Sequence, residues 1–166
     1  VKFCITEIHD DYLLATVVQA GYVGSNKAAD LSRHIDLDPV TDKDKEAFKI
    51  GLDLGETHFA LSFTNSAADV HEVRKIIGNN SNLISKIESI KGVLNLGEIL
   101  ALVDQILIDR GDLSREVDIE KIPFIQRRII SHARSHETPA FVATNLLESM
   151  IHTSSPTRAE VNDVAS

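Results

Sequence analysis

Lys86 and Glu88 are the first residues whose types and spacing suggest chemistry. They lie in the stretch Leu83-Ile-Ser-Lys-Ile-Glu-Ser89, where apolar positions alternate as in a short β-strand. Residues two apart lie on the same side of a strand, so the ammonium and the carboxylate face the same way. A charged pair at the end of an apolar run is costly to bury without partners. Either those partners are structural, or a ligand binds there.

Two further apolar runs also end in polar residues: Arg110-Gly-Asp112 follows one, and Thr144 follows the other. Glu88 and Asp112 could share one hard divalent cation, and magnesium suits carboxylate oxygens combined with water and substrate oxygens. Lys86 beside them is a compact charge suited to a transferring phosphoryl group or an enolate oxygen. Gly111 would let backbone N–H groups approach a bound anion.

Each of these features also has a structural interpretation. A Lys–Glu pair is often only an ion pair, Arg-Gly-Asp is a common chance tripeptide, and Thr144 can cap a following helix. Their occurrence at successive strand ends, with Ser62 and Asn65 at another, favours an active site. Ligands of parallel α/β sheets bind beyond the carboxyl ends of the strands.

The elements that must position these residues alternate along the chain. Strands are predicted near residues 58–63, 83–87, 105–109 and 140–143, and helices near 67–77, 94–103, 119–136 and from about Leu146. Strands alternating with helices predict βα units, a parallel sheet and the α/β fold class. Four such units are compatible with an open doubly wound sheet or with part of a β/α barrel.

The first 39 residues have a different pattern. Residues 1–8 and 12–18 are β-rich runs on either side of a turn, which predicts a hairpin. Asp38-Pro39 marks a junction, so we predict domains at residues 1–39 and 40–166. Thr41 and Asp44 then form a capping-box pattern that predicts a helix to about Leu54.

Composition narrows the possible partners. The 17 basic and 25 acidic residues give a net charge of −8, so no basic stripe is available for nucleic acid. One cysteine excludes an internal disulfide and a cysteine-based zinc site. No apolar run approaches the length of a membrane span, and no signal-peptide pattern opens the chain. We expect a cytoplasmic protein, with an organelle left open, and both ends of the chain look cut.

At its candidate chemical residues the chain resembles the pyruvate kinase family. Ile84-Ser-Lys-Ile-Glu88 is similar to the strand that carries the family's catalytic lysine and metal-binding glutamate. Arg110-Gly-Asp-Leu113 is similar to the next strand end, whose aspartate is the second metal ligand. Further similar segments include those around Thr144, at Leu147-Glu-Ser-Met150, Pro156-Thr-Arg-Ala-Glu160, residues 68–75, Ser62-Phe63, and Gly24-Ser-Asn-Lys27.

This resemblance implies an incomplete (β/α)8 TIM-type barrel of about four βα units, preceded by the hairpin remnant of an inserted, lid-like β-domain. It implies phosphoryl transfer between phosphoenolpyruvate and ADP, giving pyruvate and ATP in glycolysis, with Mg²⁺ or Mn²⁺ and possible K⁺. Lys86 would be catalytic, and Glu88 and Asp112 would hold the divalent metal. Thr144, with the backbone at Arg110 and Gly111, would bind the pyruvate moiety. Lys27 would reach nucleotide phosphates, and Ser62 would lie near potassium.

The chain also departs from the family pattern. Asn65 stands where arginine is usual, Asp109 replaces a small residue, Ser114 replaces a glycine and Asn145 replaces a glutamine. Asp109 adds negative charge beside a site meant for an anionic substrate. These departures keep a non-catalytic structural or interaction subunit open as an alternative. A third alternative is a magnesium-dependent lyase acting on pyruvate-like enolates, by fold-level analogy alone.

The predicted sheet cannot close an eight-strand barrel by itself. Open sheet edges and an uncovered apolar flank favour aggregation unless another surface covers them. We therefore expect the chain to form an oligomer or to pack against further polypeptide.

Overall fold

The structure is a computed structural model that describes residues 1–25, 29, 31–32, 35 and 37–165. Contacts within the chain define two compact units, Val1–Ile35 and Asp36–Ser166. The predicted domain boundary between residues 39 and 40 stays a prediction.

The first unit contains an antiparallel hairpin, as its alternating sequence predicted. Strands β1 (Lys2–Ile8) and β2 (Leu13–Gln19) pair in a register that places Phe3 opposite Val17. The turn is closed by a 3.0 Å hydrogen bond from the His9 N–H to the Tyr12 carbonyl, and the two rings stack with centroids 4.4 Å apart. Every residue of both strands is exposed.

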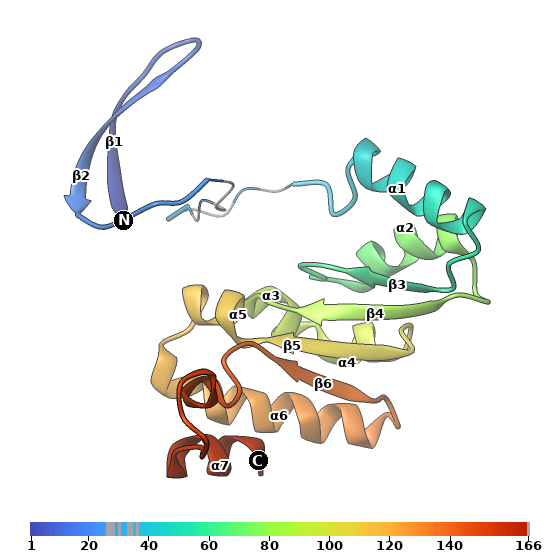
Figure 1. The fold of residues 1–166 in the computed structure, drawn as a ribbon. Coiled ribbons are helices and arrows are strands. Elements are labelled where there is room, and N and C mark those ends of the chain that lie inside the picture. Colours follow the sequence, from blue (N-terminus) through green and yellow to red (C-terminus); the bar gives the residue numbers. More distant parts are fainter. Residues whose placement is uncertain (26–28, 30, 33–34, 36, 166) are drawn as a thin grey trace. The chain divides into compact units, whose positions relative to one another are not determined.

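The second unit alternates helices and strands (Figure 1). Its strands are β3 (His58–Leu61), β4 (Asn82–Ile87), β5 (Gln105–Asp109) and β6 (Ala140–Ala143). Its helices are α1 (Asp42–Asp53), α2 (Ala67–Ile77), α3 (Ile90–Leu94), α4 (Leu96–Leu100), α5 (Arg110–Glu116), α6 (Ile122–Ser135) and α7 (Arg158–Val164), with 3₁₀ helices at Ile119–Lys121 and Glu148–Ile151.

The four strands of the second unit form a parallel sheet in the order β3-β4-β5-β6. Ile84 of β4 pairs with Ala60 and with Gln105, and Ile106 of β5 pairs with Ala140. Spatial order therefore follows chain order, and all four carboxyl ends lie at one edge. The predicted α/β class with a parallel sheet is confirmed.

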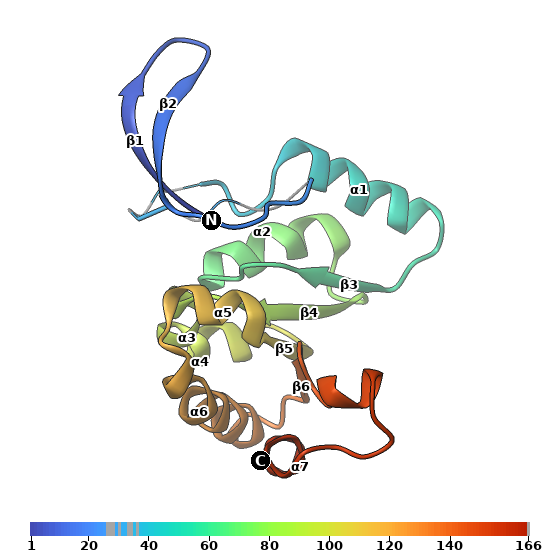
Figure 2. The ribbon, with the colours of Figure 1, turned by 60° about the vertical axis from the view of Figure 1, so that its left-hand side comes forward.

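The two faces of the sheet have different surroundings. Leu83, Ile87, Ile106 and Ile108 alternate along β4 and β5 and are buried with apolar residues of α2, α4 and α6. Helix α6 lies beside β6 in both ribbon views (Figure 2). The strand residues between these buried ones, which point to the other side of the sheet, are half-buried or exposed; they include Ile84, Leu107 and Phe141. We call this second side the open face.

Local sequence explains where the first two helices of this unit begin. Thr41 caps α1: its hydroxyl accepts from the Asp44 N–H, and the Asp44 carboxylate accepts from the Thr41 N–H at 2.9 Å. Ser66 and Asp69 form the same reciprocal pair at the start of α2. The capping box predicted at Thr41 is therefore present. Such caps satisfy N–H groups that the first helical turn leaves without partners.

Three helix predictions differ from the structure. The helix expected at residues 94–103 is only the shorter α4, and a separate helix, α3, precedes it and ends at Leu94. Helix α5, directly after β5, was not predicted. The helix expected from about Leu146 is wrong: a 3₁₀ turn occupies part of that region, and α7 begins only after the Thr157 cap. Among the residues that the structure describes, no helix is both long and apolar enough to cross a bilayer.

Candidate active site

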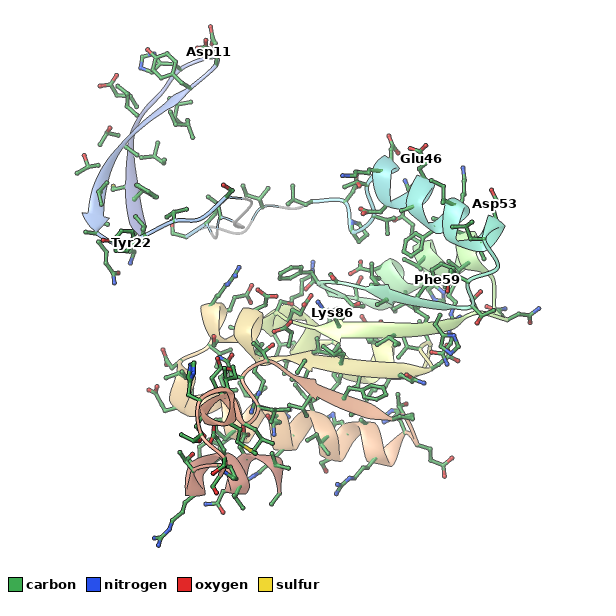
Figure 3. All side chains as sticks on the ribbon, viewed as in Figure 1. Asp11, Tyr22, Glu46, Asp53, Phe59 and Lys86 are labelled. Carbon is green, nitrogen blue, oxygen red and sulfur yellow. The ribbon has the colours of Figure 1, made fainter. Side chains whose placement is uncertain are left out.

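The residues singled out from the sequence lie at the carboxyl edge of the sheet. Lys86 is near the end of β4 (Figure 3). Glu88 follows that strand. Asp109 ends β5, and Arg110, Gly111 and Asp112 form the first turn of α5. Ser62 follows β3 and Thr144 follows β6. Parallel strands bring these separate segments to one edge.

Lys86 and Glu88 form an ion pair with 2.6 Å between Nζ and Oε1. Glu88 is 1% exposed, and its other oxygen accepts a 2.6 Å hydrogen bond from the Phe63 N–H. The Lys86 ammonium also donates to the Ser62 hydroxyl at 3.4 Å. The carboxylate is thus held by one cation and one backbone donor, which offset the cost of burying its charge.

The Lys86 ammonium keeps its proton in this setting. Burial lowers the pKa of Lys86, but the hydrogen bond and charge of Glu88, with the charges of Asp109 and Asp112, raise it above its ordinary value overall. A cation that cannot easily lose its proton suits the stabilisation of anionic oxygens. Proton abstraction by Lys86 is correspondingly disfavoured.

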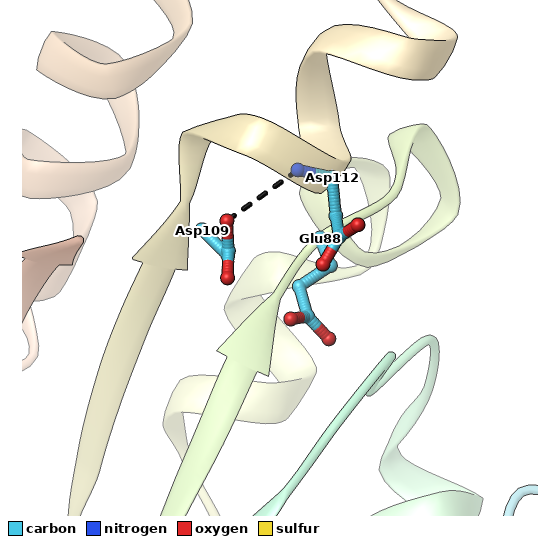
Figure 4. Close-up of side chains that lie close together, drawn as sticks. All are labelled: Glu88, Asp109 and Asp112. Carbon is cyan, nitrogen blue, oxygen red and sulfur yellow. Dashed lines mark hydrogen bonds between the residues drawn. The ribbon is translucent and has the colours of Figure 1, made fainter. Parts of the chain in front are cut away.

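Three carboxylates lie close together at this edge of the sheet, as Figure 4 shows. Glu88, Asp109 and Asp112 each offer one oxygen, and these oxygens all lie within 4.8 Å of one another. Lys86 Nζ is 3.9 Å from Asp109 Oδ2, and Arg115 is 3.3 Å from Asp112 Oδ1. Glu88 Oε1 is buried next to the Lys86 ammonium, which is its partner at 2.6 Å. Clustered carboxylate oxygens are the donors that Mg²⁺ and Mn²⁺ prefer, so the residues fit such an ion.

Asp109 connects this cluster to Thr144 and α5. Its Oδ1 accepts hydrogen bonds from the Thr144 hydroxyl at 2.7 Å, the Gly111 N–H at 3.1 Å and the Asp112 N–H at 3.4 Å. Burial raises the pKa of Asp109, but these donors and the Lys86 charge hold it below the ordinary value. An added Cβ at Gly111 would lie 3.0 Å from Thr144 Cγ2, so a larger residue there would crowd Thr144.

The Arg110 side chain has structural partners. Its guanidinium donates to the Asp163 carboxylate, to Gln126 Oε1 at 3.4 Å and to the Thr144 carbonyl at 2.6 Å. It therefore ties the end of β5 to α6, to α7 and to the segment after β6. The binding role predicted for Arg110 concerns its backbone and stays a prediction.

Two strand-end residues have left-handed backbone conformations. Phe63 has φ of 49° and Thr144 has φ of 77°. Such angles are unusual for a bulky and a β-branched residue, and they often occur where a functional site fixes the backbone. At Phe63 the conformation aims the N–H at Glu88.

The structure thus brings together most of the predicted site. Lys86, Glu88, Asp112 and Ser62 form one cluster, and Gly111 and Thr144 join it through Asp109. Lys27 lies outside the described residues. Sequence reasoning noted Asp109 only as a departure and missed its place at the centre. Leu107 lies beside Lys86 on the neighbouring strand, and Asp109 is two residues after Leu107, so it lies on the same side of the sheet as Lys86. This two-residue spacing is the signal that could have revealed the position of Asp109.

Comparisons with known proteins agree on one family. The family description "Pyruvate kinase, barrel domain" matches residues 1–166. The pyruvate kinase of Mycobacterium intracellulare is 41% identical over 170 residues, covering 99% of this chain and 36% of that protein. A pyruvate kinase of Agrobacterium vitis is 37% identical, covering 99% of the chain and 34% of its own length.

A relative from a plant extends the comparison. Plastidial pyruvate kinase 3 of Arabidopsis thaliana, described as chloroplastic, is 38% identical, with coverage of 93% of the chain and 28% of that protein. The chain spans about a third of the length of the curated relatives it matches.

Proposed function

This chain belongs to the pyruvate kinase family, and from that premise we propose that it supplies the phosphoryl-transfer centre of a pyruvate kinase. The reaction would move a phosphoryl group between phosphoenolpyruvate and ADP, giving pyruvate and ATP. The observation that carries the proposal is the Lys86–Glu88 pair beside Asp112, with carboxylate oxygens within 4.8 Å of one another. Phosphoryl transfer depends on positioned charges more than on a covalent nucleophile.

Each residue has a distinct proposed role. Glu88 and Asp112 would hold Mg²⁺ or Mn²⁺, which supplies neutralisation of charge on the reacting oxygens when bound. Lys86 stabilises charge on the transferring phosphoryl group and on the enolate oxygen. Thr144, with the backbone at Arg110 and Gly111, binds the pyruvate moiety. Ser62 lies near the proposed potassium position, and Lys27 is proposed to reach nucleotide phosphates.

The proposed fold context is part of a larger barrel. We regard the parallel sheet as about half of a (β/α)8 barrel and the hairpin as part of an inserted β-domain. The open face would then be the barrel interior, covered by further strands or by another chain. The cytoplasm is the proposed compartment, and the chloroplastic relative keeps an organelle open.

A non-catalytic relative is the second candidate, and two observations favour it. Asp109 places a third carboxylate among the proposed substrate-binding groups. Asn65, where the family usually has arginine, accepts a hydrogen bond from the Ser89 hydroxyl and through its carbonyl from Asn95 at 2.7 Å. That position therefore makes structural contacts and offers no cation. No contact in the site specifically favours the lyase alternative.

A coupled assay of pyruvate formation from phosphoenolpyruvate and ADP tests the proposal in the intact natural protein. We expect Mg²⁺-dependent turnover that falls about 10²- to 10³-fold in Lys86→Met, because an electrostatic stabiliser is removed. Lys121→Met, at an exposed lysine that pairs with Asp118, is the matched control and should keep its activity. Absence of turnover in a folded parent protein would support the non-catalytic relative, and pyruvate release without ADP would indicate a lyase.

A further inference from the structure

The hydrogen-bond donors around the Asp109 carboxylate would also suit an anionic ligand. One oxygen of its carboxylate accepts from two backbone N–H groups and from the Thr144 hydroxyl, at 2.7 to 3.4 Å. Its other oxygen faces the Lys86 ammonium at 3.9 Å. Hydrogen-bond donors grouped around a carboxylate beside a cation are the usual arrangement for binding such a group. Here the carboxylate comes from the chain itself.

Helix capping explains only part of this arrangement. As the residue before α5, Asp109 accepts from the N–H groups of Gly111 and Asp112, as a capping aspartate does. The third donor, Thr144, belongs to the segment after β6 and is not part of that helix. It holds the unusual φ of 77° while donating to Asp109. The donor set therefore joins two strand ends around one carboxylate.

We infer that the Asp109 carboxylate occupies the place of the substrate's carboxylate, so that a 2-oxo acid must displace it in order to bind. This inference rests on the proposed function, which gives Thr144 and the Gly111 backbone to the pyruvate moiety. Two carboxylates cannot accept from the same N–H and hydroxyl groups at once, and two negative charges side by side repel each other. Asp109 is thus a specificity-determining residue that weakens binding of carboxylate ligands.

Three variants of the intact protein distinguish two effects of Asp109: its side chain fills the donor groups, and its negative charge repels a ligand carboxylate. Asp109→Ala empties the donor set, whereas Asp109→Asn keeps an oxygen that can accept from Gly111 and Thr144 but removes the charge. Asp118→Asn changes an exposed aspartate that pairs with Lys121 and serves as the matched control. Pyruvate in the presence of MgCl₂ is the probe, and its affinity is measured by titration calorimetry.

We expect Asp109→Ala to bind pyruvate at least about tenfold more tightly than the parent, since displacement and repulsion are both removed. Asp109→Asn should fall between the two, and Asp118→Asn should match the parent. Equal or weaker binding by Asp109→Ala, including no binding, would overturn the inference. If loss of the cap prevents Asp109→Ala from folding, unchanged affinity in Asp109→Asn would overturn it as well.

The test of this inference can be distinguished from the test of the proposed function. The inference is tested by the pyruvate affinity of the variants, whereas the proposed function is tested by the turnover of the parent protein. A parent that turns over, combined with no gain in Asp109→Ala, would remove the inference and leave the function. A parent without turnover, combined with tighter pyruvate binding by Asp109→Ala, would support the inference and remove the function.

Discussion

At the scale of single residues, the buried charge of Glu88 depends on Lys86. The ammonium lies 2.6 Å from a carboxylate whose side chain is fully buried. Removing one member of such a pair leaves an uncompensated charge and costs about 3 kcal/mol or more. Lys86→Met should therefore lower the free energy of unfolding by about that amount, measured by urea denaturation.

The double variant provides the control for this effect. Lys86→Met with Glu88→Gln removes both charges, so we expect it to regain part of the stability lost in Lys86→Met. An additive loss in the double variant would show that Lys86 stabilises the fold through packing and not through Glu88.

Divalent metal binding should stabilise the protein through the same residues. A ligand that binds only the folded state at about 100 times its Kd adds about 2.7 kcal/mol to the free energy of unfolding. We expect MgCl₂ or MnCl₂ to raise the Tm of the parent and of Asp118→Asn, and to have no such effect on Asp112→Asn. A rise of equal size in Asp112→Asn would contradict the proposed ligand set.

Residue types could be predicted at this scale, but side-chain directions could not. Lys86, Glu88 and Asp112 form a cluster as their strand-end positions indicated. The guanidinium of Arg110 instead contacts Asp163, a residue 53 positions away that no local pattern connects to it. The direction of a long side chain depends on such tertiary partners. Asp109 was visible as a departure, whereas its three donors appear only in the folded structure.

At the scale of elements, two helical glycines have opposite surroundings. A Cβ on Gly92 in α3 would lie 2.5 Å from the Thr64 carbonyl oxygen, whereas Gly97 in α4 has nothing within 4 Å. Gly92→Ala should therefore destabilise the protein by about 1 to 3 kcal/mol through overpacking. Gly97→Ala should be neutral or add up to about 1 kcal/mol by favouring the helix.

Thermal unfolding of both glycine variants provides the measurement. Gly97→Ala is the matched control, because it makes the same chemical change one helix later. If both variants lowered the Tm equally, the close approach of α3 to Thr64 would not be the cause.

Asp104 connects α2 to the start of β4. Its carboxylate accepts from the Leu83 N–H and from Arg74, each at 2.7 Å. Burial raises the pKa of Asp104, but these two hydrogen bonds and the Arg74 charge hold it below its ordinary value. Because the folded-state pKa is lower, this contribution is present above the unfolded pKa of about 3.9 and disappears as pH falls through the folded value.

Asp104→Asn should therefore lose stability at pH 7 and show a smaller further loss on acidification than the parent does. Chemical denaturation at pH 7 and pH 3 measures both effects, and the loss at pH 7 should be at most about 1 kcal/mol, because the carboxylate is partly exposed and solvent screens its charge. An unchanged difference between the two pH values would show that Asp104 does not carry this part of the pH dependence.

Strands were easier to predict than the helices that connect them. The four parallel strands followed from their apolar runs. Helix α5 was not predicted, because its signal is the capping pattern of Asp109 and not an apolar periodicity. After β6, an apolar pattern resembling a helix instead contains left-handed residues at Asn145 and Leu147.

At the scale of the whole molecule, the open face of the sheet leaves apolar side chains of the second unit uncovered. Leu107 and Ile84 are only half-buried, and Phe141 is 50% exposed. Exposed apolar patches of this kind mark contact surfaces or cause aggregation. We expect the isolated 166-residue polypeptide to self-associate and to bind hydrophobic dyes.

Substitution on that face tests its role. Phe141→Lys should reduce self-association in sedimentation velocity, whereas Phe124→Lys, at an exposed phenylalanine of α6, should not. A monomeric polypeptide without dye binding would contradict the expected need for a covering surface.

The strand order β3-β4-β5-β6 has a consequence for how the protein is made. Paired residues such as His58 and Asn82, or Ile106 and Ala140, are separated by about 20 to 35 positions in the chain. A ribosome adds such a segment in roughly 1 to 7 s, at about 5–20 residues per second. Each new strand can therefore pair with the free edge of the strand made just before it. The sheet can grow in the direction of translation, one βα unit at a time, without waiting for distant parts of the chain.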